Sequence, residues 1–332
     1  MRIPGRRYVG RLVRWALSRG PGNVLILGYH RVGNGDPDPF GLGVSARHFA
    51  EQMEVLGRSA RCMALGDAVR GLAEGTLPPR AVAVTFDDGY ADTLHTALPV
   101  LERQGVPATV FVTTGFLGTE FWWDELARTV LAGWGPENRR DPGTVRLTTG
   151  GRTHEWRLEP GRDRRAAKNR RRVLEEMSGI LLTAPPAARA AALRDVRRWA
   201  GLPAAGADDP RALTDEELKR LAASPLIEIG AHGDSHAMLG TLGLAEQRRE
   251  VGKSRETLQA LTGAVVTSFS YPHGSLSRET VEIVGDTGFT AACCSREDVA
   301  VTGENPLTLP RFWVRDRGGG PFGCWLERWL HG

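Results

Sequence analysis

The chain has 332 residues, of which 41% are hydrophobic and 25% are charged, and its formal net charge at pH 7 is +4. This length and apolar content allow a large core and exclude a mainly disordered chain, and one α/β barrel domain often reaches this size. The modest net charge gives no reason to expect a nucleic-acid partner. No stretch approaches the roughly 18 to 20 apolar residues that a membrane-spanning helix needs.

Residues 1–20 form a basic N-terminal segment. Seven arginines precede Asp36, the first acidic residue. Arginines divide the apolar residues before position 15, and the apolar run at 24–27 is too short for the core of a signal peptide. Such a segment can touch an anionic membrane surface, although packing against the protein is commoner. We therefore expect a cytoplasmic protein with at most peripheral membrane contact through this segment.

Cysteine usage agrees with that location. The four cysteines show no C-x-x-C spacing, which argues against a zinc cluster, and neighbouring cysteines in an apolar stretch usually behave as small hydrophobic residues. In the cytoplasm they are expected to be reduced. They are Cys62, Cys293, Cys294 and Cys324.

Strand-like and helix-like stretches alternate along most of the chain. Apolar runs predict strands at 24–29, 82–86, 108–112, 226–230, 265–270, 289–293 and 307–313. Helical patterns lie at 45–58, with Ser45 as the N-cap, and at 91–104 and 244–262. Alternation of this kind favours parallel strands joined by right-handed helical crossovers.

The middle of the chain, roughly 124–213, departs from this alternation. Two polar strand-like runs, 144–148 and 154–158, flank a turn that contains two glycines, which predicts a β-hairpin. A basic run at 162–172 and helices interrupted by two prolines follow, and 201–210 is typical of a flexible connector. We interpret the stretch as an insertion into a single domain that covers 21–332.

Two adjacent carboxylates, Asp87 and Asp88, follow the predicted strand at 82–86 in the sequence Thr-Phe-Asp-Asp-Gly. Neighbouring buried carboxylates repel each other and lose hydration, so they are costly without a cation or a proton between them. An ordinary Asp-Gly turn at a strand end is the simpler alternative.

A pair of histidines, His232 and His236, follows the predicted strand at 226–230. With eight histidines in the chain, this spacing arises by chance in roughly one such chain in six, so the pair alone is a weak signal. Both motifs nevertheless follow apolar strands, and the ends of several parallel strands often supply ligands for one metal. Two imidazoles and one carboxylate would leave a coordination position open for water.

Taken together, these residues resemble the polysaccharide deacetylases of carbohydrate esterase family 4, also called the NodB-homology domain. Residues 85–89 resemble the first family motif, 232–236 the second, and 270–274 a variant of the third. Further similarity covers 24–49, 106–121 and 307–314, and the early Tyr-His pair at 29–30 resembles biofilm-type poly-N-acetylglucosamine deacetylases. The resemblance implies an α/β fold, an irregular, incomplete (β/α)7 barrel of the NodB type with an α+β insertion.

The resemblance also implies a metal-dependent hydrolase that removes the acetyl group from a 2-acetamido sugar, in a glycan or in a lipid-linked or nucleotide-linked intermediate. Asp87 would be the general base that activates water, and Asp88, His232 and His236 would hold a divalent metal. The developing oxyanion would be held by the metal and by the backbone N–H near Tyr271. Zinc suits two histidines and one carboxylate, with cobalt, nickel and manganese as alternatives.

Two positions depart from the family pattern. The segment 307–313 has no histidine where many relatives carry the general acid, so we predict that His30 has this role; a buried histidine bonded at a strand end is the alternative. Ser270 stands where many relatives have an arginine that pairs with the base. We predict that Arg311 replaces it, the alternative being an ordinary surface arginine.

Three residues are predicted to contact the sugar: Tyr271, His273 and Trp123. His273 stands where relatives often have tyrosine and can equally cap a loop, and tryptophan is commoner in a core than on a sugar. Two other functions remain open. A carbohydrate-binding pseudoenzyme would tolerate loss of the motif residues, and an Asp-nucleophile phosphatase normally needs Asp-x-Asp, where Gly89 stands here.

Overall fold

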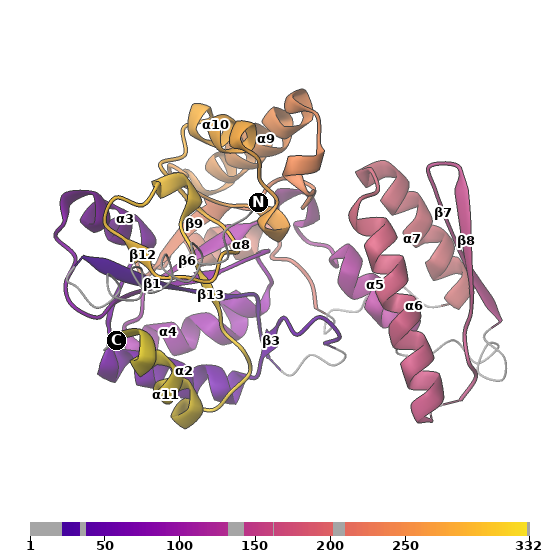
Figure 1. Cartoon of the computed structure of the whole chain (residues 1–332), viewed down its shortest axis with the longest axis horizontal. Coiled ribbons are helices and arrows are strands. Elements are labelled where there is room, and N and C mark those ends of the chain that lie inside the picture. The colour runs from indigo at the N-terminus through magenta and orange to yellow at the C-terminus, as the bar shows by residue number, and fades with distance from the viewer. Residues whose placement is uncertain (1–21, 34–37, 132–142, 162, 202–209, 331–332) are drawn as a thin grey trace, which may run out of the picture. The chain divides into compact units, whose positions relative to one another are not determined.

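The computed structural model describes residues 22–33, 38–131, 143–161, 163–201 and 210–330. The basic segment 1–20 and most of the expected connector, 202–209, lie outside these residues. The described chain falls into two compact units (Figure 1). The first contains the described residues of 1–34, 42–117 and 213–332, and the second those of 35–41 and 118–212.

A curved, mainly parallel sheet forms the centre of the first unit. Its order is β11-β10-β9-β6-β5-β1-β12. The bounds are β1 (Asn23–Tyr29), β5 (Ala81–Phe86), β6 (Ala108–Val112), β9 (Ile227–Ala231), β10 (Ser268–Ser270), β11 (Ala291–Cys293) and β12 (Ala300–Val301). Only β12 is antiparallel to its neighbour, β1. Short strands complete the unit: β4 (Arg61–Met63) beside β5, and β2 (Arg31–Val32) paired with β3 (Gly43–Val44).

The segment 309–313 joins β11, at one end of the sheet, to β1 near the other end. Leu309 pairs in parallel with Cys293 of β11, and β13 (Phe312–Trp313) pairs in parallel with β1. The predicted strand at 307–313 is therefore interrupted, since 306–308 form a 3-10 turn and Pro310 has no N–H for a strand ladder. The irregular, incomplete barrel expected from the sequence is confirmed.

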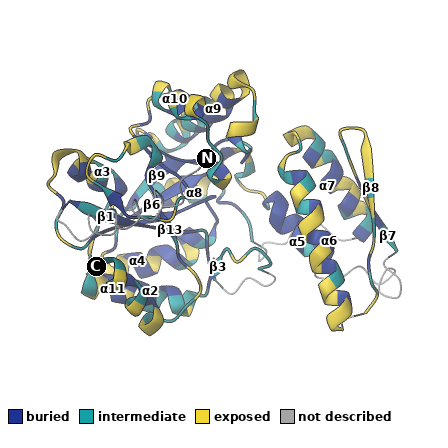
Figure 2. Ribbon diagram, in the orientation of Figure 1, coloured by how far each residue is buried: buried dark blue, intermediate teal, exposed yellow. Residues whose placement is uncertain are grey.

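Helices cover the outside of this unit. They are α2 (Ala46–Ser59), α3 (Leu65–Glu74), α4 (Leu98–Gln104), α8 (Asp215–Ala222), α9 (Leu244–Thr262), α10 (Arg278–Asp286) and α11 (Gly319–Leu330). Ser45 caps α2 as predicted, because its side chain accepts a hydrogen bond from the His48 N–H. The predicted helix at 91–104 begins as a π-type turn at Thr93–Ala97 and continues as α4. Figure 2 shows buried residues along the strands and exposed residues on the outer helix faces.

In its described residues, the second unit combines three helices with one hairpin: α5 (Trp122–Leu131), β7 (Thr144–Thr149), β8 (Arg152–Arg157), α6 (Arg164–Leu182) and α7 (Pro186–Ala200). The predicted hairpin is present, and its two-residue turn is Gly150-Gly151, both with positive φ. The longer segment of this unit begins at 118, before the predicted start of the insertion at about 124. That both units belong to one domain stays a prediction.

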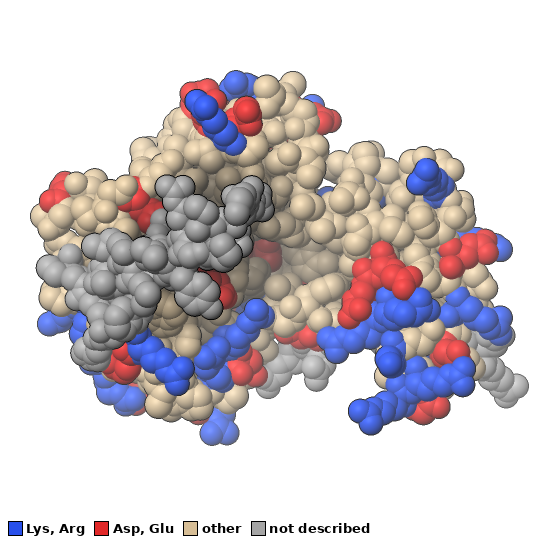
Figure 3. All heavy atoms as spheres, viewed as in Figure 1, with Lys and Arg blue, Asp and Glu red and all other residues tan. Residues whose placement is uncertain are grey.

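The basic run predicted at 162–172 lies mostly on the exposed face of α6. Several of its arginines pair with glutamates, as Arg165 does with Glu159 and Arg172 with Glu176. Blue and red atoms accordingly lie close together on this unit in Figure 3. The run is therefore in large part an ion-paired, solvated helix face.

All four cysteines are free thiols. Within the described residues, no helix combines the length and the apolar character that crossing a membrane requires.

Candidate metal centre

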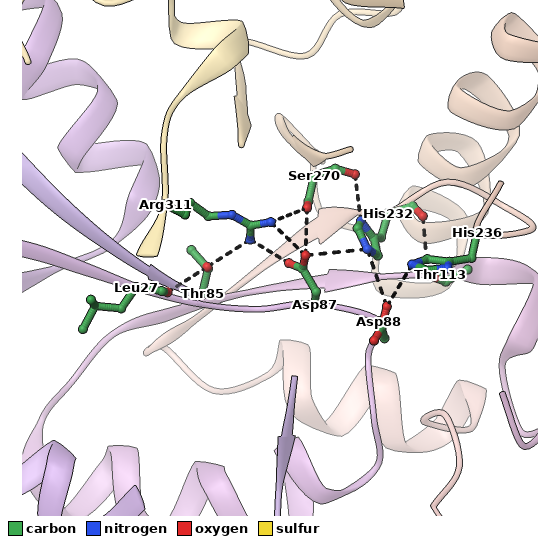
Figure 4. A network of polar contacts seen from close by, with 9 residues as sticks. All are labelled: Leu27, Thr85, Asp87, Asp88, Thr113, His232, His236, Ser270 and Arg311. Atoms are coloured by element: carbon green, nitrogen blue, oxygen red, sulfur yellow. Dashed lines mark hydrogen bonds and ion pairs between the residues drawn. The ribbon is translucent and has the colours of Figure 1, made fainter. Parts of the chain in front are cut away.

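The acidic pair and the first histidine follow directly after strands that end at the same edge of the sheet. Asp87 and Asp88 come after β5, and His232 comes after β9. β6 lies between these strands and pairs in parallel with both, so the carboxyl ends of all three lie together. His236 returns to this edge after a short loop, and Figure 4 shows the four side chains gathered at one place.

Asp88, His232 and His236 form a group that can hold a metal ion, because one ligand atom from each lies within 4.8 Å of the others. His236 Nε2 is 3.2 Å from Asp88 Oδ1, and His232 Nε2 is 3.5 Å from the same oxygen. All three residues are buried. Two imidazole nitrogens and one carboxylate oxygen are the donor set of a catalytic zinc site.

The Asp88 carboxylate fits a cation. Its Oδ1 atom is buried and accepts no hydrogen bond from the described residues. Burial raises the pKa of Asp88, and the negative charge of Asp87 raises it further against the effect of nearby histidines. A divalent ion would reverse both effects by keeping Asp88 ionised and by satisfying the bare oxygen.

His232 is held in the orientation that a metal ligand needs. Its Nδ1 lies 2.7 Å from the backbone carbonyl of Ser270, and a carbonyl can only accept, so Nδ1 carries the proton. In the neutral ring Nε2 is then the bare nitrogen, and Nε2 is the atom that faces Asp88. A backbone carbonyl on the distal nitrogen is a common way to orient a ligating histidine.

Two of the three residues that can hold the metal, Asp88 and His236, have left-handed backbone conformations, with φ of 70° and 54°. For residues other than glycine this conformation costs about 1 to 3 kcal/mol and persists only where the surroundings enforce it. After Asp88 the turn continues at Gly89, with φ of 84°, where an added Cβ would lie 3.0 Å from the side chain of Val112. Two of the non-glycine residues with positive φ are therefore ligand candidates.

Asp87 is paired with Arg311, as predicted. Arg311 Nη1 donates to Asp87 Oδ1 at 2.7 Å and Nη2 donates to Oδ2 at 2.8 Å, a bidentate pair in which both residues are buried (Figure 4). Arg311 also donates to the Thr85 hydroxyl, and its guanidinium lies over the ring of Trp313. The alternative of a surface arginine is wrong.

The charge of Arg311 decides the protonation state of Asp87. Burial raises the pKa of this carboxyl, but the guanidinium and the neighbouring His232 outweigh burial, so the pKa of Asp87 lies well below its usual range. Asp87 is consequently ionised at neutral pH. Its Oδ2 atom lies 3.6 Å from His232 Nε2, beside the ligand group.

Ser270 contacts both the Asp87–Arg311 pair and the ligand candidate His232. Its hydroxyl donates to Asp87 at 3.0 Å and accepts from Arg311 at 2.8 Å, while its carbonyl accepts from His232. The sequence singled out Ser270 only as the position of a missing arginine, and its bridging contacts were not expected. A small side chain here leaves room for the guanidinium that arrives from position 311.

His30 lies next to the same site and is half-buried. Its ring stacks on Trp313, with centroids 4.5 Å apart, and Gly28 makes this possible because an added Cβ would lie 2.7 Å from the Trp313 ring. Burial lowers the pKa of His30, although the charges of Asp88 and Asp87 oppose this. Trp313, which sequence reasoning did not single out, therefore contacts both His30 and Arg311.

Tyr271 does not present its polar groups to a substrate. Its side chain is buried, the hydroxyl donates to the carbonyl of Leu307, and the backbone N–H donates to the carbonyl of Cys293. The expected sugar contact from the Tyr271 side chain is thus corrected, because a group that is already bonded within the core is not free for a ligand. The Tyr271 N–H itself is bonded in the same way, and oxyanion binding by a backbone N–H near Tyr271 stays a prediction.

The other two predicted sugar contacts have different surroundings. His273 is exposed, has a φ of 56°, and its ring lies edge-on to His236 with centroids 4.4 Å apart, so it borders the metal group. Trp123 belongs to the second unit, where it is 6% exposed and stacks on Phe121 at 4.7 Å. Trp123 is a core residue of that unit, which leaves little of its ring to stack on a sugar.

The carboxyl edge of this parallel sheet carries an Asp and two His that can hold a metal ion beside a second, Arg-paired Asp, and comparison with known proteins identifies the family. A family model described as polysaccharide deacetylase matches residues 74–139 and 196–292. The chain belongs to the polysaccharide deacetylase family.

The chain is also similar to individual members of this family. It is 30% identical over 110 residues to a poly-beta-1,6-N-acetyl-D-glucosamine N-deacetylase of Staphylococcus epidermidis, covering 29% of this chain and 38% of the relative. IcaB from Ammonifex degensii has a TM-score of 0.59 and 19% identity, over 95% of this chain and 99% of that one. Streptococcus pyogenes deacetylase PplD has a TM-score of 0.57 and 17% identity, over 89% and 94%. The structures establish the fold, while the sequence match spans little more than a third of the curated relative's length.

Proposed function

We propose that the protein is a divalent-metal-dependent N-deacetylase that releases acetate from a 2-acetamido sugar. One observation carries the proposal: three convergent metal-ligand side chains lie beside a separate, ionised carboxylate that is held by an arginine. Family membership supports the reaction, and the name of the staphylococcal relative supports an N-acetylglucosamine-type substrate. A phosphatase would leave the histidine pair without a role.

Asp88, His232 and His236 would hold the metal, for which zinc is the first choice. When bound, such an ion makes a coordinated water acidic near neutral pH and polarises the carbonyl under attack. Asp87 would then take the proton from the attacking water. A carboxylate with a strongly lowered pKa is a weak base, so Asp87 would depend on a bound cation to make the attacking water acidic. This coupling explains why the base and the ligand group lie side by side.

Arg311 and Ser270 would hold the Asp87 oxygens in one orientation. The bidentate pair fixes both oxygens, and the Ser270 hydroxyl adds a bond to Oδ2. Because the same Ser270 supports His232 through its carbonyl, movement of the base would disturb a ligand as well. We propose both as positioning residues.

His30 would give a proton to the departing amine. It lies beside the site, and burial lowers its pKa, so the ring is mostly neutral at rest. The negative charge that develops during attack favours the protonated ring, as the two aspartates already do. His273, exposed next to His236, is our candidate for a sugar contact. We also propose a cytoplasmic location, with a lipid-linked or nucleotide-linked saccharide as substrate.

The test measures metal content and acetate release on the same purified protein. The substrates are N-acetylglucosamine oligosaccharides, nucleotide-linked N-acetyl sugars and lipid-linked saccharides. We expect one divalent ion per chain, acetate release that stops with a chelator and returns with Zn²⁺, and release slowed by about 100-fold or more in Asp87→Asn. A protein that binds no divalent ion, or that releases acetate equally well after the metal is removed, would contradict the proposal.

A further inference from the structure

The loop that joins the two histidine ligands is bound by a buried carboxylate from another element. Glu250 lies on α9, and its Oε2 accepts the backbone N–H groups of Asp234 at 3.1 Å and Ser235 at 2.8 Å. Its Oε1 accepts the Ser235 hydroxyl at 2.8 Å. Three bonds therefore join one side chain to two consecutive residues of the loop.

These three hydrogen bonds explain how the Glu250 carboxylate can be buried. Glu250 is 7% exposed, and a buried carboxylate is tolerated only where hydrogen bonds or a cation satisfy it. The hydrogen bonds that the Glu250 side chain makes to described residues all go to the loop between His232 and His236. α9 thereby holds that loop through charge-assisted bonds, which are stronger than neutral ones.

A second set of contacts, from the segment that follows β6 and from Lys253 on α9, holds the same loop. The Asp234 carboxylate accepts from the Thr114 hydroxyl at 2.8 Å and from Lys253 Nζ at 2.8 Å, and its backbone carbonyl accepts from the Gly115 N–H at 2.8 Å. The chains approach closely, since a Cβ added to Gly115 would lie 2.5 Å from the Asp234 carbonyl oxygen. Hydrogen bonds from α9 and from the segment that follows β6 thus both hold the loop.

The loop ends at His236, a metal-ligand candidate with a strained backbone conformation. His236 has a φ of 54°, which a residue with a side chain adopts only when its surroundings impose it. His236 is the residue directly after Ser235, the residue that Glu250 binds twice. The bonds of Glu250 are therefore placed to impose the conformation in which His236 Nε2 lies 3.2 Å from Asp88.

We propose that Glu250 is a positioning residue for the metal centre, which fixes His236 by holding the loop at Asp234 and Ser235 and so sets metal affinity and ligand geometry. Glu250 does not itself belong to the ligand group. The inference rests on the proposed metal site, and it adds a residue from α9 to a centre otherwise built from strand ends.

The experiment titrates the metal-free, full-length protein with Co²⁺ and records its visible absorption spectrum, which reports ligand geometry. Glu250→Gln keeps the size of the side chain but replaces one acceptor oxygen by a donor. We expect Co²⁺ binding to weaken on the order of 10-fold or more, with an altered spectrum. Glu250→Asp, which keeps the charge but is shorter, should recover part of the affinity. Glu256→Gln, an exposed glutamate on the same helix, is the matched control and should behave like the unmodified protein.

The outcomes separate the inference from the function on which it rests. If the unmodified protein binds no Co²⁺, the proposed metal centre itself fails. If it binds Co²⁺ and Glu250→Gln has the same affinity and spectrum, only the role of Glu250 is refuted. If Glu250→Gln does not fold, Ser235→Ala decides, because it removes the hydroxyl bond to Glu250 and leaves the Glu250 side chain in place. Weaker binding with a changed spectrum supports the proposal, and unchanged binding overturns it.

Discussion

Replacement of Arg311 tests the central pair of the site. Arg311→Met removes the guanidinium and keeps a long apolar side chain, which leaves Asp87 buried without its bidentate partner. Removing one member of a buried ion pair costs about 3 to 5 kcal/mol of unfolding free energy, because the remaining charge is uncompensated. We expect a loss of this size at neutral pH. Misplacement of Asp87 should also lower kcat/KM on the order of 100-fold.

The pH dependence of this loss follows from the pKa of Asp87. In the unmodified protein the pair lowers that pKa, so it stabilises the fold above the ordinary carboxyl pKa of about 3.9, and the contribution disappears only as the pH falls through the lowered value. In Arg311→Met the guanidinium is gone, so burial dominates and raises the pKa of Asp87. Protonation of Asp87 then relieves the unpaired charge, so the difference in stability between the two proteins should shrink as the pH falls from about 7.5 to about 5.

The assay is urea unfolding of the metal-free proteins at both pH values, with acetate release of the metal-loaded proteins in parallel. Arg296→Met is the control, since Arg296 forms ion pairs with Glu304 and Asp298 at a partly exposed site and should lose at most about 1 kcal/mol. The reasoning is refuted if Arg311→Met is as stable as this control, or if its loss of stability does not depend on pH.

Adding Ser270→Arg to Arg311→Ser, which returns a cation from the neighbouring position, should recover part of the activity.

Three further predictions concern the reacting groups. Asp87→Asn should keep its metal and lose about 100-fold to 10,000-fold in turnover, and a near-normal rate would remove Asp87 as the base. His232→Ala should lower the metal content measured by elemental analysis, with the exposed His95→Ala as the control; full occupancy would refute the ligand assignment. His30→Ala should keep its metal and lose the basic limb of the pH–rate profile, and a profile that retains this limb would exclude His30 as the acid.

Local sequence determined the strands and the chemistry that they carry. Apolar runs ending in Asp-Asp and in the histidine pair show both the strand and the side chains that follow it, and the observed β5 and β9 lie within one residue of the predicted bounds. The Gly-Gly hairpin and the Ser45 cap were predictable for the same reason, since each depends on residues only a few positions apart.

Contacts between distant segments were decided only by the tertiary structure. Arg311 meets Asp87 from 224 positions away because 309–313 closes the sheet between β11 and β1, and Ser270 bridges the pair because β10 ends beside it. Tyr271 turns into the core, and Glu250 reaches the histidine loop from a helix that no motif marks. A sequence states which groups are available, whereas strand register and packing select the pairs that meet.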